Sequence, residues 1–369
     1  MEHTFTKRIK EILQKHFKEN GEEIFEKSPL LQYLNLKTKS ANKGSKSRAA
    51  FAALYSMYVI IEDYLNHKFD VEGNYSKYEG ARFTPLLKRA REFPFCEKIQ
   101  NHSFNNRTNK EFQNKFPDNP EVIFNVNKRY WINDALLKIN IDKKNFNIAK
   151  AIIEIIDEFT KTKMESFERF IQTCEEMQKL KDDDTAKIEK FIMDLLAPNV
   201  DARLFEIVSY AILKNFYHDQ KIYWGFEPDE INEDNLKLFK TGRTNANDGG
   251  IDFVMKPLGR FFQVTETLDV KKYFLDIDKI ERYPITFVIK TEETNKAVLK
   301  QLKANAIKIY SIEAVVEKYM DCIEEIINIP TLKERFQSAI KQGYLVQILD
   351  EVVLQSKMEF NYQEIESEE

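Results

Sequence analysis

Side chains with oxygen atoms suited to binding a cation are spaced along two neighbouring β-favouring segments. Asp252 lies in the first segment, Ile251–Met255, and Gln263 and Thr265 lie two residues apart in the second, Arg260–Thr265. A short stretch with proline and glycine separates the segments, which predicts a hairpin. Because strand side chains alternate between two faces, pairing brings the three polar groups to one patch. Such oxygen donors suit a hard cation such as Mg²⁺.

The sequence around these residues resembles a nuclease family. Gly-Gly-Ile-Asp, ending at Asp252, is followed by Phe-Gln-Val-Thr, ending at Thr265. This pattern resembles the PD-(D/E)XK nuclease superfamily, particularly the restriction endonucleases with the motif G-G-x-D…Q-x-K. The resemblance implies that Asp252, Gln263 and the main-chain carbonyl of Val264 hold Mg²⁺, for which Mn²⁺ can substitute.

Thr265 departs from this pattern, because it stands where the family has a lysine that assists the attacking water. Threonine has no cation to lower the pKa of a water or to stabilise a pentavalent phosphate. Glu266 points to the opposite face of the strand, whereas Lys271 or Lys272, at the start of the next segment, can reach back. The alternative is an altered residue at Thr265, natural or engineered, that weakens or removes catalysis.

The segments around the hairpin predict an α/β core. Asp201 is the expected N-cap of a helix over Ala202–Tyr217, and Glu206 lies on its flank. The superfamily often carries an acidic residue at such a place, so the resemblance adds Glu206 to the site. Further expected elements are a first core strand (Lys221–Gly225), a helix (Asp269–Arg282), two strands (Ile285–Ile289 and Ala306–Tyr310) and a helix (Ser311–Tyr319).

Length and composition predict a two-domain cytoplasmic protein. The 369 residues are 43% apolar and 31% charged, with a formal net charge of −4 that excludes a uniformly basic DNA-coating protein. The three cysteines are far apart and form no C-x-x-C pair, which argues against a zinc site or disulfide framework and fits a reducing compartment. The sequence shows no apolar run of membrane-spanning length, so no membrane association is expected.

Helical periodicity dominates the first half of the chain. Helices are expected over His3–Phe17, Gly21–Leu34 and Asn147–Lys179, and the charged run Lys179–Thr185 ends the last of them. The expected domains are a mainly helical DNA-recognition domain (1–180), a PD-(D/E)XK-like mixed-sheet core flanked by helices (181–330), and a helical extension with an acidic tail (331–369).

Residues 37–48 carry five basic side chains and no acidic one. One interpretation is a solvated loop, which is the fate of most short basic runs. The other is an arm that tracks the DNA backbone through phosphate contacts by Lys39, Lys43, Lys46 and Arg48. The sequence leaves both open.

Residues 77–115 carry nine Lys or Arg against four Glu, together with amide and hydroxyl side chains that can read base edges in the major groove. An Asn-rich turn whose amides bond their own backbone is the simpler interpretation. Beside a nuclease-like hairpin we favour DNA contact, with the candidates Arg82, Arg89, Arg91, Gln100, Asn101, His102, Asn105, Asn106 and Arg107.

The resemblance implies a type II restriction endonuclease, a Mg²⁺-dependent site-specific deoxyribonuclease that cuts double-stranded DNA. A homodimer would match a palindromic site, and a cognate DNA methyltransferase would be its functional partner. A second hypothesis keeps the nuclease fold as a DNA-binding protein with lost or attenuated catalysis, because of Thr265. A third is an unrelated α/β protein acting on small molecules, with Asp252 as a turn residue.

Overall fold

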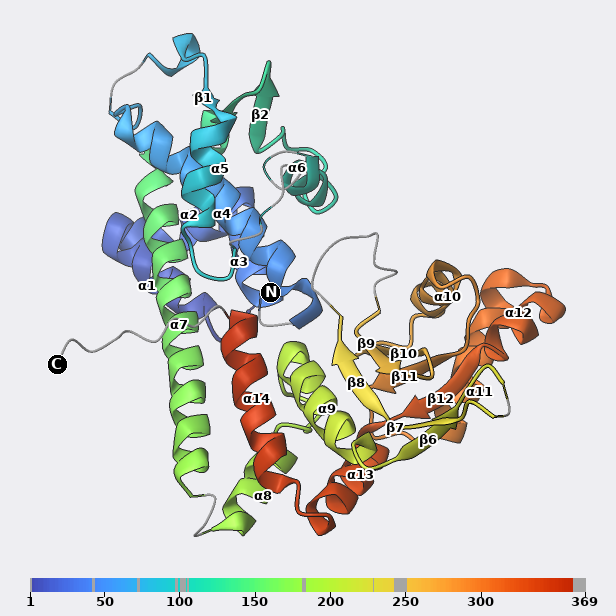
Figure 1. Ribbon diagram of the computed structural model, residues 1–369. Coiled ribbons are helices and arrows are strands. Elements are labelled where there is room, and N and C mark those ends of the chain that lie inside the picture. Colours follow the sequence, from blue (N-terminus) through green and yellow to red (C-terminus); the bar gives the residue numbers. More distant parts are fainter. Residues whose placement is uncertain are drawn as a thin grey trace. The chain divides into compact units, whose positions relative to one another are not determined.

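The computed structural model describes residues 2–41, 44–71, 74–96, 99, 104, 106–180, 184–227, 229–241 and 251–360. The chain divides into two compact units, one up to Phe170 and one from Ile171 (Figure 1). The division falls within α7 (Ala149–Lys179), a helix of 31 residues. From sequence the first boundary was placed at 180, where this helix ends.

The first unit is built around α4 (Gly44–Asn66), whose residues 50–61 are all buried. A helix that is buried all round forms the centre of a bundle rather than its surface. The helices that join it in this unit are α1 (Thr6–Phe17), α2 (Gly21–Lys27), α3 (Pro29–Ser40), α5 (Phe83–Arg91), α6 (Asn106–Gln113) and the first part of α7. In the part of the chain that the structure describes, no helix is both long enough and apolar enough to cross a membrane.

Two sequence-based expectations for this unit are wrong. The single helix expected over Gly21–Leu34 is two helices, because the Ser28 side chain accepts a hydrogen bond from the Leu31 N–H and Pro29 starts α3. Within the basic run 37–48, the described residues 37–40 and 44–48 are helical rather than parts of a loop. Helix α3 continues to Ser40 and α4 begins at Gly44, so only a short connection separates them.

Short antiparallel strands complete the first unit. One sheet has the order β1-β3-β2, and β4 pairs with β5 in a second. Left-handed residues at Asn127 and Lys128, and at Asp142 and Lys143, form the tight turns of the two hairpins. The strands are β1 (Ala81–Arg82), β2 (Ile123–Val126), β3 (Arg129–Ile132), β4 (Lys138–Ile141) and β5 (Lys144–Asn147).

A five-stranded sheet forms the centre of the second unit, in the order β12-β11-β10-β9-β8. Neighbours from β8 to β10 pair antiparallel, and neighbours from β10 to β12 pair parallel. The chain is therefore mixed α/β, as the sequence predicted. The strands are β8 (Lys237–Lys240), β9 (Phe253–Lys256), β10 (Arg260–Thr265), β11 (Ile285–Ile289) and β12 (Ile323–Ile327).

Helices cover both faces of this sheet. On one face α10 (Val270–Lys279) and α11 (Asn295–Tyr310) share an apolar cluster with β11, where the rings of Tyr273 and Phe287 lie 4.3 Å apart. On the other face α9 (Ala202–Tyr217) places Tyr210 5.2 Å from the Phe253 ring. Helices α13 (Ile329–Lys341) and α14 (Leu345–Phe360) pack against α9, and α8 (Thr185–Asp194) packs against α14.

The hairpin β9–β10, the strand β11 and the capped helices on either side confirm the expected order around Asp252. Asp201 caps α9 by accepting a hydrogen bond from the Arg203 N–H at 2.9 Å, and Asp269 caps α10 in the same way. These caps fix where the two helices begin, and therefore which of their side chains reach the end of the sheet.

Two expected core strands are wrong. The strand expected at Lys221–Gly225 is β6 (Lys221–Trp224), which pairs with β7 (Asn232–Asn235) in a separate two-stranded sheet, and β8 takes its place in the core. The strand expected at Ala306–Tyr310 is the end of α11. Its buried residues Val298, Leu302 and Ala306 recur every four positions, so helical periodicity overrides a short alternating run. The last strand is β12, and α12 (Glu313–Met320) precedes it.

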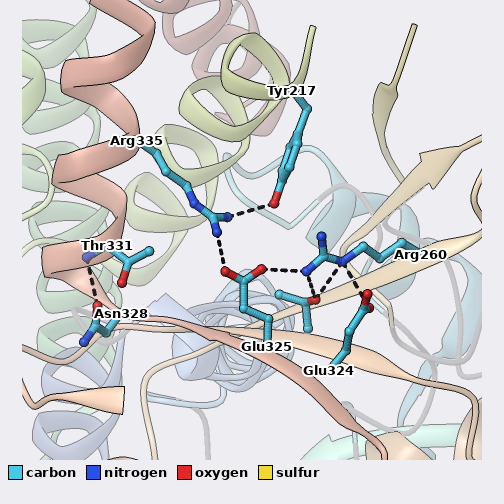
Figure 2. Close-up of polar contacts among 8 residues, drawn as sticks. Tyr217, Arg260, Glu324, Glu325, Asn328, Thr331 and Arg335 are labelled. Atoms are coloured by element: carbon cyan, nitrogen blue, oxygen red, sulfur yellow. Dashed lines mark hydrogen bonds and ion pairs between the residues drawn. The ribbon is translucent and has the colours of Figure 1, made fainter. Parts of the chain in front are cut away.

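A network of ionic hydrogen bonds ties the sheet to α9 and α13 (Figure 2). The Arg260 guanidinium donates to Glu325 at 2.6 Å, to Glu324 at 3.0 Å and to the Thr286 hydroxyl. Arg335 donates to the other Glu325 oxygen and, at 2.8 Å, to the Tyr217 hydroxyl. Glu325 therefore bridges two arginines, whereas Glu324 contacts one.

We expect Glu325→Ala to destabilise the protein by roughly 2 kcal/mol, because it leaves two largely buried guanidinium groups without their shared acceptor. Glu324→Ala is the matched control. Its side chain is 40% exposed, and its loss should cost roughly 0–1 kcal/mol. Urea denaturation of both variants measures the difference, and equal values would show that Glu325 has no special role.

Candidate functional site

Asp252 immediately precedes β9, at the edge of the sheet where β10 ends. Its carboxylate accepts a hydrogen bond from the Val264 N–H at 2.7 Å, and its own N–H donates to the Phe262 carbonyl at 3.0 Å. Phe253 pairs with Phe262, so continuing the antiparallel register by one residue places Asp252 opposite Gln263. Opposed residues share a face of the sheet, so the register puts these two side chains on the same face.

Gln263 carries a buried side-chain oxygen for which the described part of the chain offers no partner. The residue is only 7% exposed, and its Oε1 atom has no hydrogen-bond partner among the described residues. Its Nε2 atom donates to the Val264 carbonyl at 3.4 Å. A buried carbonyl oxygen without a partner costs roughly 1–3 kcal/mol. An orphaned acceptor next to a carboxylate indicates a place for a cation or another donor.

Lys272 reaches the position where the resemblance expects a lysine. Thr265 is 4% exposed, and its hydroxyl accepts a hydrogen bond from the Lys272 ammonium at 3.3 Å. Lys272 extends from the first turn of α10, a helix on the same face of the sheet as Gln263 and Thr265. Lys271 is exposed in the same turn. Of the two lysines named from sequence, the structure brings Lys272 to Thr265.

Glu206 approaches Asp252 from α9, and it is paired with a lysine that sequence reasoning missed. The Lys240 ammonium lies 2.8 Å from the Glu206 carboxylate, and the Lys240 side chain is only 14% exposed. Lys240 ends β8, the strand that took the place expected for Lys221–Gly225. The alternation of Lys237, Leu238, Phe239 and Lys240 offered a signal for a strand that the sequence interpretation did not use.

Burial and a neighbouring acid raise the pKa of Asp252 to about 7. Removal from water is the largest cause, since it disfavours the charged carboxylate, and the negative charge of Glu206 adds to it. The hydrogen bond from the Val264 N–H and the positive charges of Lys272 and Lys240 act in the opposite direction. The carboxylate is thus held close to the midpoint between its protonated and charged forms at neutral pH.

The donor set fits a hard divalent cation better than a soft one. Asp252, Gln263 and the Val264 carbonyl offer oxygen atoms, and Glu206 offers two more from the other face of the sheet. No group of three or more His, Cys, Asp or Glu side chains placed to hold a metal occurs in the described ranges. A metal here would depend on amide and main-chain oxygens and retain several waters, which is how proteins often hold Mg²⁺.

The candidate DNA-contacting residues differ in their ion pairing and exposure. Arg89 forms a two-point ion pair with Glu62, at 2.9 and 3.0 Å, and Arg107 pairs with Glu111 at 3.1 Å. These two guanidinium groups are therefore bonded to acidic side chains of the first unit. Arg82, Arg91 and Asn106 are exposed, and Lys39 is half-buried in the last turn of α3.

Other candidates cannot be placed. Lys43, Gln100, Asn101, His102 and Asn105 lie outside the described residues, as do the side chains of Lys46 and Arg48. The two glycines before Ile251 also lie outside them. None of the family models, curated proteins or solved structures compared with this chain matches it significantly.

We expect Asp252→Asn to change how stability depends on pH. The folded protein holds the Asp252 proton up to a pKa of about 7, whereas the unfolded chain releases it near its ordinary value of 3.8. The wild-type unfolding free energy therefore falls as pH rises between these values. Asparagine has no proton to release, and its side-chain oxygen can still accept from the Val264 N–H.

Between pH 5 and pH 8 the stability of Asp252→Asn relative to wild type should rise by roughly 2–3 kcal/mol. Urea unfolding of both proteins across this range measures the effect, and all other titrating groups largely cancel in the difference. Parallel stability curves would contradict a raised pKa at this carboxylate.

Proposed function

We propose that this protein is a Mg²⁺-dependent endonuclease that hydrolyses phosphodiester bonds of double-stranded DNA at specific sites, in the manner of type II restriction enzymes. The observation that carries the proposal is the grouping of Asp252, the orphaned Gln263 oxygen and the Lys272 ammonium at the end of one hairpin. Each group has a chemical role in phosphodiester hydrolysis.

The order of elements supports the same proposal. Helix α9 is followed by the separate β6–β7 ribbon, and then by the antiparallel strands β8, β9 and β10, helix α10 and the parallel strand β11, with Asp252 and Gln263 at the central hairpin. This order resembles the core of the PD-(D/E)XK superfamily. Because many unrelated activities share folds, the site residues rather than the topology carry the functional argument.

Asp252, Gln263 and the Val264 carbonyl would hold Mg²⁺ against the scissile phosphate, with Glu206 as a further oxygen donor. When bound, the metal supplies a water of lowered pKa and stabilises charge on the leaving 3′ oxygen. Asp252 binds a cation in its charged form, so metal binding has to displace the proton that the buried carboxylate holds. Gln263 orients its oxygen from a rigid strand and contributes no charge.

Lys272 would supply the positive charge that Thr265 lacks. Its ammonium group donates to Thr265, and this contact fixes the long side chain beside the hairpin. From there the ammonium can orient the attacking water and stabilise negative charge on the phosphate. The lysine function would then come from a helix rather than from the strand.

We expect Lys272→Met to reduce the rate of DNA cleavage by about 10²–10³-fold, because it removes a preorganised positive charge from the reacting phosphate. Lys271→Met is the matched comparison, since it changes the same side chain one residue away at an exposed position. It should retain most of the wild-type rate. Digestion of a long, fully sequenced DNA with Mg²⁺ or Mn²⁺, followed by mapping of fragment ends, measures cleavage, specificity and stagger.

Three results would contradict the proposal or one of its parts. Equal losses of cleavage rate in Lys272→Met and Lys271→Met would show that Lys272 has no special part in catalysis. Gel shifts without discrete fragments, at any metal concentration, would favour the nuclease-fold DNA-binding protein over the enzyme. Absence of any salt-sensitive DNA affinity would reject both and favour an α/β protein that acts on small molecules.

We expect Gln263→Glu to tighten Mn²⁺ binding by at least about tenfold, because it adds a negative charge beside Asp252. Gln263→Met should weaken binding, since it removes the oxygen and keeps a similar volume. Titration at pH 8.5, above the pKa of Asp252, with detection of free Mn²⁺ by electron paramagnetic resonance, measures both. Identical affinities in the two variants would show that Gln263 is not a ligand.

The cellular context follows from the same proposal. A restriction enzyme would act in the cytoplasm, with a cognate DNA methyltransferase as functional partner. Symmetric cutting of a palindrome favours a homodimer, because the two-fold axis of the protein then matches that of the site.

A further inference from the structure

Strands β6 and β7 form a two-stranded ribbon of their own in the second unit (Figure 1). Gly225 closes the end of this ribbon, where a Cβ atom would lie 2.3 Å from the Glu230 carbonyl oxygen. Large apolar side chains of the ribbon are exposed: Tyr223 by 63%, Trp224 by 40%, Phe226 by 92% and Ile231 by 62%.

A ribbon of this kind needs a partner surface. An isolated two-stranded hairpin is marginally stable in water, because it lacks an apolar face to pack against. Among the described strands, β6 and β7 pair only with each other, and the free edge of such a strand favours association with another chain. Four large apolar side chains within about fifteen residues mark an interaction site more strongly than scattered exposed residues do.

The charge of the ribbon narrows the choice of partner. Residues 221–235 contain five acidic side chains and one basic one, a formal net charge of −4. Glu227, Asp229 and Glu230 follow the exposed Phe226 in the sequence and are themselves exposed. A surface of this sign repels the phosphates of DNA and the headgroups of anionic lipids. The partner surface must therefore be both apolar and positively charged.

Helix α11 of the same unit has these two properties. Its sixteen residues, Asn295–Tyr310, contain four lysines and no acidic residue, a formal net charge of +4, of which Lys303 pairs with Glu317 of α12. Its exposed apolar side chains continue into the start of α12. They are Leu299, Ile307, Ile309, Tyr310, Ile312 and Val315, between 36% and 59% exposed.

We propose that the β6–β7 ribbon of one copy of this chain docks on the α11 surface of a second copy. Aromatic side chains of the ribbon would cover the apolar side chains of α11, and the acidic and basic groups would pair around them. In a two-fold dimer the contact forms twice, since each copy offers both surfaces. The acidic ribbon and the basic helix attract each other, which favours ribbon-to-helix contact over ribbon-to-ribbon or helix-to-helix contact.

A charge exchange tests the proposal without DNA, so its outcome is independent of the nuclease activity. Glu227→Lys/Glu230→Lys reverses the ribbon tip, and Lys296→Glu/Lys300→Glu reverses an exposed part of α11. Each double variant should raise the dimer dissociation constant by at least about tenfold. The quadruple variant restores opposite signs and should return within about threefold of wild type. Sedimentation velocity over a range of concentrations measures all four proteins.

Phe226→Ser tests the apolar part of the contact and should weaken the dimer by at least about tenfold. Met358→Ser, on α14, is the control, because Met358 is 62% exposed and lies on neither surface. A wild-type protein that stays monomeric at all concentrations would overturn the proposal. A quadruple variant no better associated than the double variants would also overturn it.

Discussion

The central constraint on this structure is the partial burial of a carboxylate at the end of the β9–β10 hairpin. Removal of Asp252 from water disfavours its charge, and Glu206 adds repulsion, so its pKa rises to about 7. The nearby Val264 N–H, Lys272 and Lys240 offset only part of this cost. A fold that keeps this acid on the same sheet face as the Gln263 oxygen, which has no partner in the described ranges, gives up stability at the place where function is expected.

The polar side chains at the two ends of β10 differ in their hydrogen bonding. At its first residue, the Arg260 guanidinium donates to two glutamates and to the Thr286 hydroxyl, and Glu325 links it to Arg335 (Figure 2). Toward its other end, the Gln263 side-chain oxygen has no hydrogen-bond partner among the described residues, and the Thr265 hydroxyl bonds the Thr267 backbone and the Lys272 ammonium. Several charged partners around Arg260 indicate a structural role, whereas a buried acceptor without a partner indicates room for a ligand.

Charged residues of the first unit illustrate why counts of basic side chains are a weak guide to DNA contact. Arg89 and Arg107 belong to a stretch with a positive excess, yet each guanidinium is bonded to a glutamate within the unit. Asn109, from the same stretch, is buried and bonds the backbone of Val122 and Ile123. The simpler interpretation, in which amides support their own fold, holds for Asn109.

The sequence by itself determined the local features. Alternation and turn residues predicted the hairpin that carries Asp252 and Gln263, and capping residues predicted where α9 and α10 begin. These signals depend on neighbours within a few positions, so they can be interpreted without the fold. The tertiary structure decided which of Lys271 and Lys272 meets Thr265, which strand stands beside β9, and that Lys240 pairs with Glu206. These contacts join residues far apart in the chain or depend on how a helix is rotated on the sheet, and hydrophobic packing fixes both only when the whole core forms.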